Sequence, residues 1–442
     1  MHRAHPYANA NGHAHHQQHP RDRVPDRQQQ NQQNPRYSNQ HSSNHQQNYA
    51  QPAQVPAALL AEADRQRVSA DLLKYMSEAK FPYISDIDNY DKIDKIGQGT
   101  FGEVFKAKCK KTNRLVALKK ILMENEKEGF PITALREIKM LQMLKHENVT
   151  ELIEICGRKN GPQARDRCTF YLVFTFCDHD LAGLLSSKVQ INLAQRKTLL
   201  KHLFNGLFTI HRNKILHRDM KAANVLIGSD GYLKLADFGL ARPLFKKTPE
   251  NPEACYTNRV VTLWYRPPEL LLGERNYGPA IDMWGAGCIM AEFWTKMPIM
   301  QGDTEQKQLD LITQFCGSIT PAVWPTCEKL PLYGKLDMAT NLPRKVGDKL
   351  GKFVRDQQGL DLIEHLLSLD PNKRITASDA LYHSFFYTKP LPNDTVKDLL
   401  STLTTSMFEY THGRGQQRGN PPPQQLQQHP RPPNNQYQDR CY

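Results

Sequence analysis

The sequence of 442 residues lacks the features that mark membrane, secreted and nucleic-acid-binding proteins. It contains no apolar run as long as a membrane span and no apolar signal segment near its start. Its 9 cysteines include no Cys-x-x-Cys pair, which favours reduced thiols in the cytosol or nucleus over disulfides or zinc sites. Because RNA- and DNA-binding motifs are also missing, we expect no membrane association and no direct sequence-specific nucleic-acid binding.

Large apolar residues are scarce at both ends of the chain. Residues 1–56 consist mainly of His, Gln, Asn, Arg and Pro, and residues 413–442 mainly of Gln, Pro and Arg. Such segments bury too little apolar surface to offset the entropy lost on ordering, so we expect both tails to be disordered. His13, His15 and His16 offer metal-ligand atoms, but a solvated spacer is the favoured interpretation. The net charge of +13 suits acidic or nucleic-acid-rich surroundings without establishing a partner.

The residues between the tails have the apolar patterning of a folded protein. Residues 57–89 predict a helix followed by a linker, and the helical part fits either a helix docked on the domain or a partial helix. Residues 90–386 are long enough to form a two-lobed domain. Residues 387–412 then form a C-terminal extension of that domain.

The richest set of reactive side chains is His217-Arg218-Asp219-Met220-Lys221-Ala222-Ala223-Asn224, followed by Asp237-Phe238-Gly239. Phosphoryl transfer needs a carboxylate to accept the proton of the attacking hydroxyl, and oxygen ligands to hold Mg²⁺ across the phosphates. Asp219 suits the first role, and Asn224 and Asp237 suit the second. Strand-like runs at 225–227 and 232–235 predict a β-hairpin that brings Asn224 and Asp237 to the same end. The alternative, a chance occurrence of the two tripeptides, is disfavoured by their spacing.

The run Ile96-Gly97-Gln98-Gly99-Thr100-Phe101-Gly102-Glu103-Val104 fits the pattern G-x-G-x-x-G-x-V. Glycines at these positions let the backbone approach nucleotide phosphates. The same glycines open dinucleotide-binding folds, but those need a helix immediately afterwards. Here a strand is predicted instead, and Val116-Ala117-Leu118-Lys119 forms the next one, with Lys119 placed to bind the α- and β-phosphates.

A helix is predicted from Pro131 onward, and it places Glu137 where an ion pair with Lys119 is expected. Leu135 lies about 200° from Glu137 around the helix axis. If Glu137 faces the cleft, Leu135 therefore faces away from it, where an apolar side chain invites a partner protein. The alternative is that Leu135 packs under the preceding loop.

Together these motifs resemble those of protein kinases, and the helix sequence Pro-Ile-Thr-Ala-Leu-Arg-Glu at 131–137 is similar to that of the cyclin-dependent kinases. The likeness covers residues 90–386 and continues through 400–402 and 406–410. It implies an α+β class, the two-lobed eukaryotic protein kinase fold. The small N-lobe is then mainly β with one key helix, the larger C-lobe is mainly α, and the tails flank them.

The resemblance also implies roles for individual residues. Phe174 is the gatekeeper, and Cys177 presents its main chain to adenine, although a reactive thiol is an alternative role for Cys177. Lys221 steadies the γ-phosphate, and Thr262 forms a hydrogen bond near Asp219. The rest of the nucleotide pocket comprises Ile96, Gly97, Gln98, Gly99, Thr100, Phe101, Gly102, Val104, Ala117, Lys119 and Leu226. Two structural roles are implied as well: Asp282 anchors the catalytic-loop backbone, and Glu269 pairs with Arg374.

The implied function is a proline-directed serine/threonine protein kinase that uses ATP and Mg²⁺. A cyclin, expected to be of the T type, activates it, and its substrate is the C-terminal domain of RNA polymerase II in the nucleus, which promotes transcription elongation. A cell-cycle cyclin-dependent kinase is the nearest alternative, but the 131–137 helix sequence and Phe-Glu-Tyr at 408–410 favour transcription. Two further alternatives belong to other classes of protein. One is a pseudokinase, which would lack part of the catalytic set, and the other is an RNA-associated protein, which would act through its tails.

Regulation is predicted at two loops. Thr257 is the expected activating phosphosite, five residues before Thr262 as in related kinases, and Arg136, Arg218 and Arg242 are placed to bind its phosphate. Thr248 and Tyr256 are the alternative sites. The glycine loop carries Phe101 where cell-cycle relatives carry tyrosine, so inhibitory tyrosine phosphorylation is not expected there.

Overall fold

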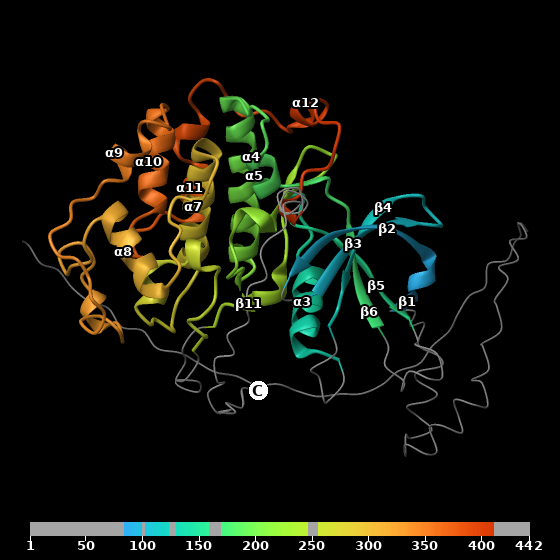
Figure 1. Ribbon diagram of the computed structural model, residues 1–442, viewed down its shortest axis with the longest axis horizontal. Coiled ribbons are helices and arrows are strands. Elements are labelled where there is room, and N and C mark those ends of the chain that lie inside the picture. The colour runs from blue at the N-terminus through green and yellow to red at the C-terminus, as the bar shows by residue number, and fades with distance from the viewer. Residues whose placement is uncertain (1–83, 100–101, 123–129, 159–168, 246–254, 411–442) are drawn as a thin grey trace, which may run out of the picture. The chain divides into compact units, whose positions relative to one another are not determined.

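The computed structural model describes residues 84–99, 102–122, 130–158, 169–245 and 255–410 (Figure 1). The predictions for both tails, for the segment that begins at residue 57, and for Thr100, Phe101 and Thr248 concern positions outside these ranges and stay predictions. None of the described helices combines the length and the apolar character that crossing a membrane requires.

The N-lobe contains one six-stranded sheet in the order β1-β5-β6-β4-β3-β2. Its strands are β1 (Ile84–Asp86), β2 (Tyr90–Gly99), β3 (Gly102–Cys109), β4 (Leu115–Lys120), β5 (Leu152–Arg158) and β6 (Thr169–Thr175). Strands β2 and β3 form the antiparallel hairpin that carries the glycine-rich loop, and β4 pairs with both β3 and β6. Val116 and Leu118 in β4 are buried in the core beneath the sheet, so the alternating Ala117 and Lys119 face the cleft. The predicted strands are confirmed.

Strand β1 and the short 3₁₀ helix η1 (Ile87–Asn89) precede residue 90 and pack on the edge of this sheet. Strand β1 pairs in parallel with β5, with Ile84 opposite Ile155. The Ser85 hydroxyl donates to Glu154 at 2.6 Å, and the Tyr90 hydroxyl donates to the same carboxylate at 2.6 Å. Ordered structure therefore extends N-terminal to the boundary at residue 90.

Helix α3 (Ile132–Met143) begins directly after Pro131, as predicted, and Pro131 has a φ of −59°. The inward face contains Ala134, Glu137, Ile138 and Leu141, all of which are buried. The opposite face exposes Ile132, Leu135 and Met143. The helix is thus amphipathic in the sense that the sequence predicts, with Glu137 directed inward and Leu135 outward.

The C-lobe is mainly helical (Figure 1). Its helices are α4 (Leu181–Ser186), α5 (Leu193–Arg212), α6 (Pro268–Leu271), α7 (Ala280–Thr295), α8 (Glu305–Cys316), α9 (Val346–Leu350), α10 (Gln357–Leu366), α11 (Ala377–Leu381) and α12 (Lys397–Leu400). Short 3₁₀ turns are η2 (Ala222–Asn224), η3 (Phe238–Leu240), η4 (Leu263–Tyr265), η5 (Cys327–Lys329) and η6 (Ser384–Phe386). Helix α7 is buried along nearly its whole length, which fits its almost continuous apolar sequence.

Three short strand pairs position the catalytic segments between the lobes. Strands β9 (Val225–Ile227) and β10 (Leu233–Leu235) form the predicted antiparallel hairpin, and β7 (His179–Asp180) pairs with β9. Strand β8 (Ile215–Leu216) pairs with β11 (Arg242–Pro243). The chain between β8 and β9 carries Asp219 and Asn224, and the turn after β10 carries Asp237. The hairpin thus brings both expected metal ligands to the cleft, because both line the same cavity.

The C-terminal extension returns across the C-lobe toward the hinge between the lobes. Lys197 donates to the Thr388 carbonyl at 2.7 Å, and the Val396 N–H donates to the Gly231 carbonyl at 3.1 Å. Beyond α12, Met407 forms a parallel bridge with His179 in β7. Residues 387–410 therefore pack along the domain as far as its nucleotide cleft.

Candidate active site

A cavity of about 600 Å³ lies between the sheet and the catalytic loop. Ten of the predicted nucleotide-pocket residues line it, namely Ile96, Gly97, Gln98, Gly102, Val104, Ala117, Lys119, Phe174, Cys177 and Leu226. Gly99 ends β2, and its predicted place in the pocket stays a prediction. Gly102 has a φ of 136°, and a Cβ there would lie 2.1 Å from the Lys120 carbonyl oxygen, so only glycine fits this position.

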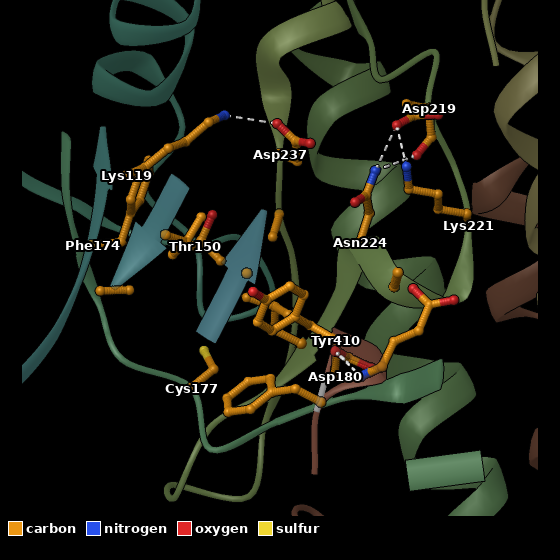
Figure 2. Close-up of a pocket in the computed structure, with 18 of the residues that line it drawn as sticks. Lys119, Thr150, Phe174, Cys177, Asp180, Asp219, Lys221, Asn224, Asp237 and Tyr410 are labelled. Atoms are coloured by element: carbon orange, nitrogen blue, oxygen red, sulfur yellow. Dashed lines mark hydrogen bonds and ion pairs between the residues drawn. The ribbon is translucent and has the colours of Figure 1, made fainter. Parts of the chain in front are cut away.

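Lys119 is held by two carboxylates that line the cavity, those of Glu137 and Asp237. Figure 2 shows the contact with Asp237. Its Nζ atom lies 2.8 Å from Glu137 Oε1 and 2.8 Å from Asp237 Oδ1. Burial alone would lower the pKa of Lys119, but the charges of Asp237 and Glu137 outweigh it and raise the pKa above its usual value. Burial opposes ionisation of Asp237 too, yet the Lys119 charge holds the Asp237 pKa below its usual value. Lys119 and Asp237 therefore stabilise each other's charged form.

The predicted ion pair between Lys119 and Glu137 is thus formed in the single chain. The physical reason is local: Ala134, Ile138 and Leu172 form a small core that packs α3 against the sheet. A cyclin would then act on this pair by stabilising an arrangement that the chain already reaches.

Asp219 is surrounded by the side chains predicted to work with it (Figure 2). Its Oδ1 atom accepts hydrogen bonds from the Thr262 hydroxyl at 2.9 Å and the Thr262 N–H at 3.2 Å. Its Oδ2 atom lies 3.1 Å from Lys221 Nζ and accepts from Asn224 Nδ2 at 2.9 Å. These contacts fix the orientation of the carboxylate, which is 5% exposed and lines the cavity.

Asn224 and Asp237 carry oxygen atoms suited to a hard divalent cation. Asn224 directs its amide nitrogen to Asp219, with hydrogen bonds to the carbonyl at 2.8 Å and to Oδ2 at 2.9 Å. Its Oδ1 atom is consequently the end available to a cation. Asp237 contributes a carboxylate with one oxygen directed to Lys119. A donor set of carboxylate and amide oxygens fits Mg²⁺, which takes oxygen ligands.

The catalytic-loop backbone is anchored from below by Asp282 of α7. Asp282 accepts from the N–H groups of His217 at 3.0 Å and Arg218 at 2.9 Å. Arg218 has a φ of 67°, a left-handed conformation that is costly for a residue with a side chain, and the bond to Asp282 helps to stabilise it. The predicted pair of Glu269 and Arg374 is also formed and buried, with an N–O distance of 2.6 Å.

Residues of the C-terminal extension line the same cavity, which the sequence analysis did not predict. Phe408, Glu409 and Tyr410 are among the lining residues, and Figure 2 shows Tyr410 near Cys177 and Asp180. Asp180 accepts from the Glu409 N–H at 2.9 Å, and burial raises the pKa of Asp180 to about 6. The signal that could have found this contact is the kinase-like sequence at 406–410, which lies outside the domain.

Gly183 in α4 leaves the space in which residues 406–410 pack. A Cβ at Gly183 would lie 2.8 Å from backbone atoms of both Met407 and Phe408. The Met407 N–H donates to His179 Nδ1 at 3.1 Å, and its carbonyl accepts from the Asp180 N–H at 3.0 Å. We call residues 406–410 the C-terminal strap.

The predicted phosphosite Thr257 is exposed, whereas the alternative Tyr256 is 4% exposed. The Thr257 carbonyl accepts from the Tyr277 hydroxyl at 2.6 Å, and the same hydroxyl accepts from Arg218 at 3.0 Å. The Tyr277 hydroxyl thus links Arg218 to the Thr257 backbone by two hydrogen bonds. Arg136 and Arg242 are partly buried, and their expected convergence on the phosphate stays a prediction.

Leu135 is 48% exposed on α3, as the sequence predicts, while Glu137 on the inward face is 5% exposed. Packing under the preceding loop, the alternative for Leu135, would bury more of this side chain. The exposed apolar face also contains Ile132 at 55% and Met143 at 60% exposure. The surface expected to contact a cyclin is therefore apolar and accessible.

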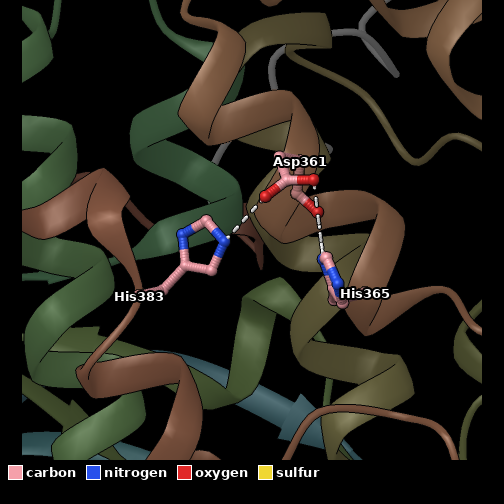
Figure 3. A group of neighbouring side chains, drawn as sticks. All are labelled: Asp361, His365 and His383. Carbon is pink, nitrogen blue, oxygen red and sulfur yellow. Dashed lines mark hydrogen bonds and ion pairs between the residues drawn. The ribbon is translucent and has the colours of Figure 1, made fainter. Parts of the chain in front are cut away.

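Among the described residues, a further group of potential metal ligands lies on the C-lobe surface, formed by Asp361, His365 and His383 (Figure 3). His383 Nδ1 accepts from the Phe385 N–H at 3.2 Å, so the proton of neutral His383 sits on Nε2 and points to Asp361 at 3.0 Å. His365 Nδ1 donates to the Asp361 carbonyl at 2.9 Å. Because both rings direct protons toward Asp361, we interpret the group as a hydrogen-bonded link between α10 and η6.

Comparison with known proteins gives a consistent result. The protein kinase domain family matches residues 90–386. The chain is 62% identical over 340 residues to Cyclin-dependent kinase 9 of Homo sapiens, which covers 77% of this chain and 91% of that protein. It is 60% identical over 359 residues to Cyclin-dependent kinase 9 of Xenopus tropicalis, covering 80% and 95%. The crystal structure of the yeast RNA Pol II CTD kinase CTDK-1 complex superposes with a TM-score of 0.62 at 42% identity, covering 69% of this chain and 94% of that one.

Proposed function

The chain belongs to the protein kinase family and, within it, to the cyclin-dependent kinases related to Cyclin-dependent kinase 9, and from this premise we propose that it phosphorylates the C-terminal domain of RNA polymerase II. It is an ATP-dependent serine/threonine protein kinase, and its proposed role is to promote transcription elongation in the nucleus. The similarity to a CTD kinase complex supports the substrate. The observation that carries the proposal is the set of contacts that joins Asp219 to Thr262, Lys221 and Asn224.

In this reaction Asp219 accepts the proton of the substrate serine as its oxygen attacks the γ-phosphate. Thr262 fixes the orientation of Asp219, since its hydroxyl and N–H both donate to Oδ1. Lys221, whose Nζ lies 3.1 Å from Asp219, is placed to steady the transferred phosphate. Most of the rate enhancement in such reactions comes from positioning and charge stabilisation rather than from covalent chemistry.

Lys119 binds the α- and β-phosphates, and Glu137 keeps its side chain extended into the cleft. Mg²⁺, held by Asn224 and Asp237, would neutralise charge across the phosphates when bound. The main chain of Cys177 would bind adenine at the hinge, because its side chain is buried and burial raises the pKa of its thiol, which disfavours the reactive thiolate. Phe174 would close the back of the adenine site as the gatekeeper.

The preference for proline after the target serine rests on Val261. Val261 has a φ of 65°, which is a strained conformation for a β-branched residue. Arg266 holds it there, donating to the Val261 carbonyl at 3.1 Å and to the Val260 carbonyl at 2.9 Å. With this carbonyl turned toward Arg266, the N–H of an ordinary residue after the serine would have no acceptor, whereas proline has no N–H to satisfy.

The proposed partner is a cyclin of the T type that covers the exposed apolar face of α3. Leu135 would lie within that interface. Phosphorylation of Thr257 would then add nearly two negative charges beside Arg218 and, as we expect, Arg136 and Arg242. The arrangement supports activation by partner and phosphate together, since α3 packs against η3, which follows Asp237, and Thr257 is linked to Arg218 through Tyr277.

The proposal is tested with the full chain purified together with the cyclin that it captures from nuclear extract. We expect phosphorylation of heptad peptides that contain Ser-Pro and not of the same peptides with Ser-Ala. The variant Asp219→Asn is the matched control, because it keeps the size of the side chain and removes the base. Equal phosphorylation of both peptides would refute the proline preference, and failure on polymerase heptads would refute the substrate.

A further inference from the structure

Tyr256, which precedes the expected phosphosite, is held on both faces by other aromatic rings. Its ring centroid lies 5.5 Å from that of Phe245 and 4.8 Å from that of Tyr277, with interplanar angles of 30° and 28°. Rings at these distances and angles are stacked, an arrangement that contributes beyond simple burial. Tyr256 therefore joins the start of the activation segment, near Phe245, to the loop that contains Tyr277.

The polar atoms of Tyr256 form a second set of contacts. Its hydroxyl donates to the Pro243 carbonyl at 2.8 Å and accepts from the Phe245 N–H at 2.6 Å. Its own N–H donates to the Arg275 carbonyl at 2.8 Å, and its carbonyl accepts from Arg275 Nε at 3.2 Å. Burial raises the pKa of Tyr256, so the hydroxyl stays protonated and keeps its role as donor.

A chain of hydrogen bonds continues from this stack to Arg218 of the catalytic loop. Arg218 donates to the Tyr277 hydroxyl at 3.0 Å, and this hydroxyl donates to the Thr257 carbonyl at 2.6 Å. The Arg218 guanidinium also lies 5.7 Å from the centre of the Tyr256 ring, within the range of a cation–π contact. The residue beside the catalytic Asp219 is thus connected to the activation segment through phenol groups of this chain.

All of these contacts are made by the rings, hydroxyls and backbone groups of the chain, and none of them uses the Thr257 hydroxyl that would carry the phosphate. We propose that Tyr256 is a positioning residue that sets the substrate-binding path of residues 257–262 independently of that phosphate. The phosphate would then strengthen an arrangement that the aromatic stack has already selected. This inference rests on the proposed function, because it concerns how the same site presents Thr262 and Val261 to a Ser-Pro substrate.

A purely structural tyrosine would lower stability and disturb the whole site. A positioning role makes a narrower prediction, because Tyr256 contacts the activation segment and is not among the residues that line the nucleotide cavity. Its loss should weaken peptide binding while leaving nucleotide binding unchanged. The Michaelis constants for peptide and for ATP therefore separate the two roles.

The experiment uses the full chain with its captured cyclin and compares Tyr256→Leu and Tyr256→Phe, each with Thr257 intact and with Thr257→Ala. We expect Tyr256→Leu to raise the KM for a Ser-Pro heptad peptide roughly tenfold in both backgrounds, with the KM for ATP unchanged. Tyr256→Phe keeps the stacked ring and should stay within about threefold of the parent. Tyr232→Ala is the control for losing an aromatic contact elsewhere, since Tyr232 stacks on His202 near β10.

Three results would overturn the proposal. In the first, Tyr256→Leu has no effect once Thr257 is replaced, which would mean that Tyr256 acts only through the phosphate. In the second, both Michaelis constants change together with the melting temperature, as expected of a structural residue. In the third, the Phe variant behaves like the Leu variant, so that the ring is not the ordering element. If the parent chain does not phosphorylate the heptad peptide, the proposed function fails, and the same comparison is made on a Ser/Thr peptide from an array that it does phosphorylate.

Discussion

Replacement of Asp282 by asparagine tests how the catalytic loop is held in place. Asp282 is 1% exposed and contacts no substrate-binding residue of the cavity. Its two carboxylate oxygens accept the N–H groups of His217 and Arg218, and Oδ2 also lies 2.9 Å from His211 Nε2. Asparagine has the same shape but only one acceptor oxygen. In the variant, one backbone N–H of the loop must therefore face an amide N–H.

The size of the effect follows from these contacts. A hydrogen bond to a charged acceptor contributes about 1.5–3 kcal/mol, and asparagine removes the charge and one of the two backbone bonds. Arg218 depends on the bond most, because its φ of 67° is strained. Since each 1.36 kcal/mol in the barrier changes the rate tenfold, we expect the kcat of Asp282→Asn to fall roughly 10- to 100-fold. The KM for ATP should hardly change, because Lys119 and the glycine loop are untouched.

The assay is steady-state phosphorylation of a Ser-Pro heptad peptide by the full chain with its cyclin. Asp361→Asn is the matched control, since Asp361 is an exposed carboxylate of the same lobe that pairs with His383 and has no link to the loop. It should leave kcat unchanged. A normal kcat in Asp282→Asn, or an equal loss in both variants, would refute the argument that Asp282 sets the loop conformation.

Three further predictions concern other parts of the structure. Leu135→Asp should abolish cyclin capture with an unchanged melting temperature, whereas Leu391→Asp, at an equally exposed leucine of the C-terminal extension, should not affect capture in the same pull-down. Gly183→Ala should displace the C-terminal strap and raise the KM for ATP several-fold, because its Cβ would lie 2.8 Å from the Met407 and Phe408 backbone; Gly278→Ala, in open space, is the control. Burial raises the pKa of Glu292 to about 8, so the native state binds a proton that the unfolded state releases, and stability falls as pH rises from about 4.5 to 8. Thermal melts should accordingly show Glu292→Gln more stable than the parent at pH 8 and little different at pH 5.

Short motifs made the catalytic centre predictable. Asp219, Asn224 and Asp237 lie within one hairpin and its flanking turns, so their spacing in the sequence largely determines their spacing in the cleft. Lys119 and Glu137 come from neighbouring elements of the N-lobe, and the opposite faces of α3 follow from helix geometry. In each case local periodicity or a turn was enough to place the side chain.

Contacts between distant segments were not predictable in this way. The C-terminal strap reaches the nucleotide cavity because Gly183 lacks a side chain and because His179 and Asp180 offer acceptors to Met407 and Glu409. These partners lie more than 200 residues apart in sequence, and no local pattern links them. In the sequence, residues 406–410 lie beyond the domain, and no pattern predicts that they contact the hinge.

Two further features could not be predicted from the sequence: whether α3 holds Glu137 against Lys119, and how Tyr256 packs. Motifs predict that Lys119 and Glu137 pair. Whether the pair is formed depends on how α3 packs against the sheet. The stack of Phe245, Tyr256 and Tyr277 joins aromatic residues that occur without regular spacing. From the sequence, Tyr256 was predicted only as an alternative phosphosite. Its burial in the stack argues against that role.

The most direct test of the account is a single kinetic comparison of the full chain with its captured cyclin on the C-terminal domain of RNA polymerase II. Phosphate incorporation is measured and its positions are mapped by mass spectrometry for the parent and for Asp219→Asn. The account predicts phosphate on serines followed by proline, and loss of activity by roughly 10²-fold or more without the Asp219 base. Full activity of Asp219→Asn, or phosphate only on serines without a following proline, would contradict it.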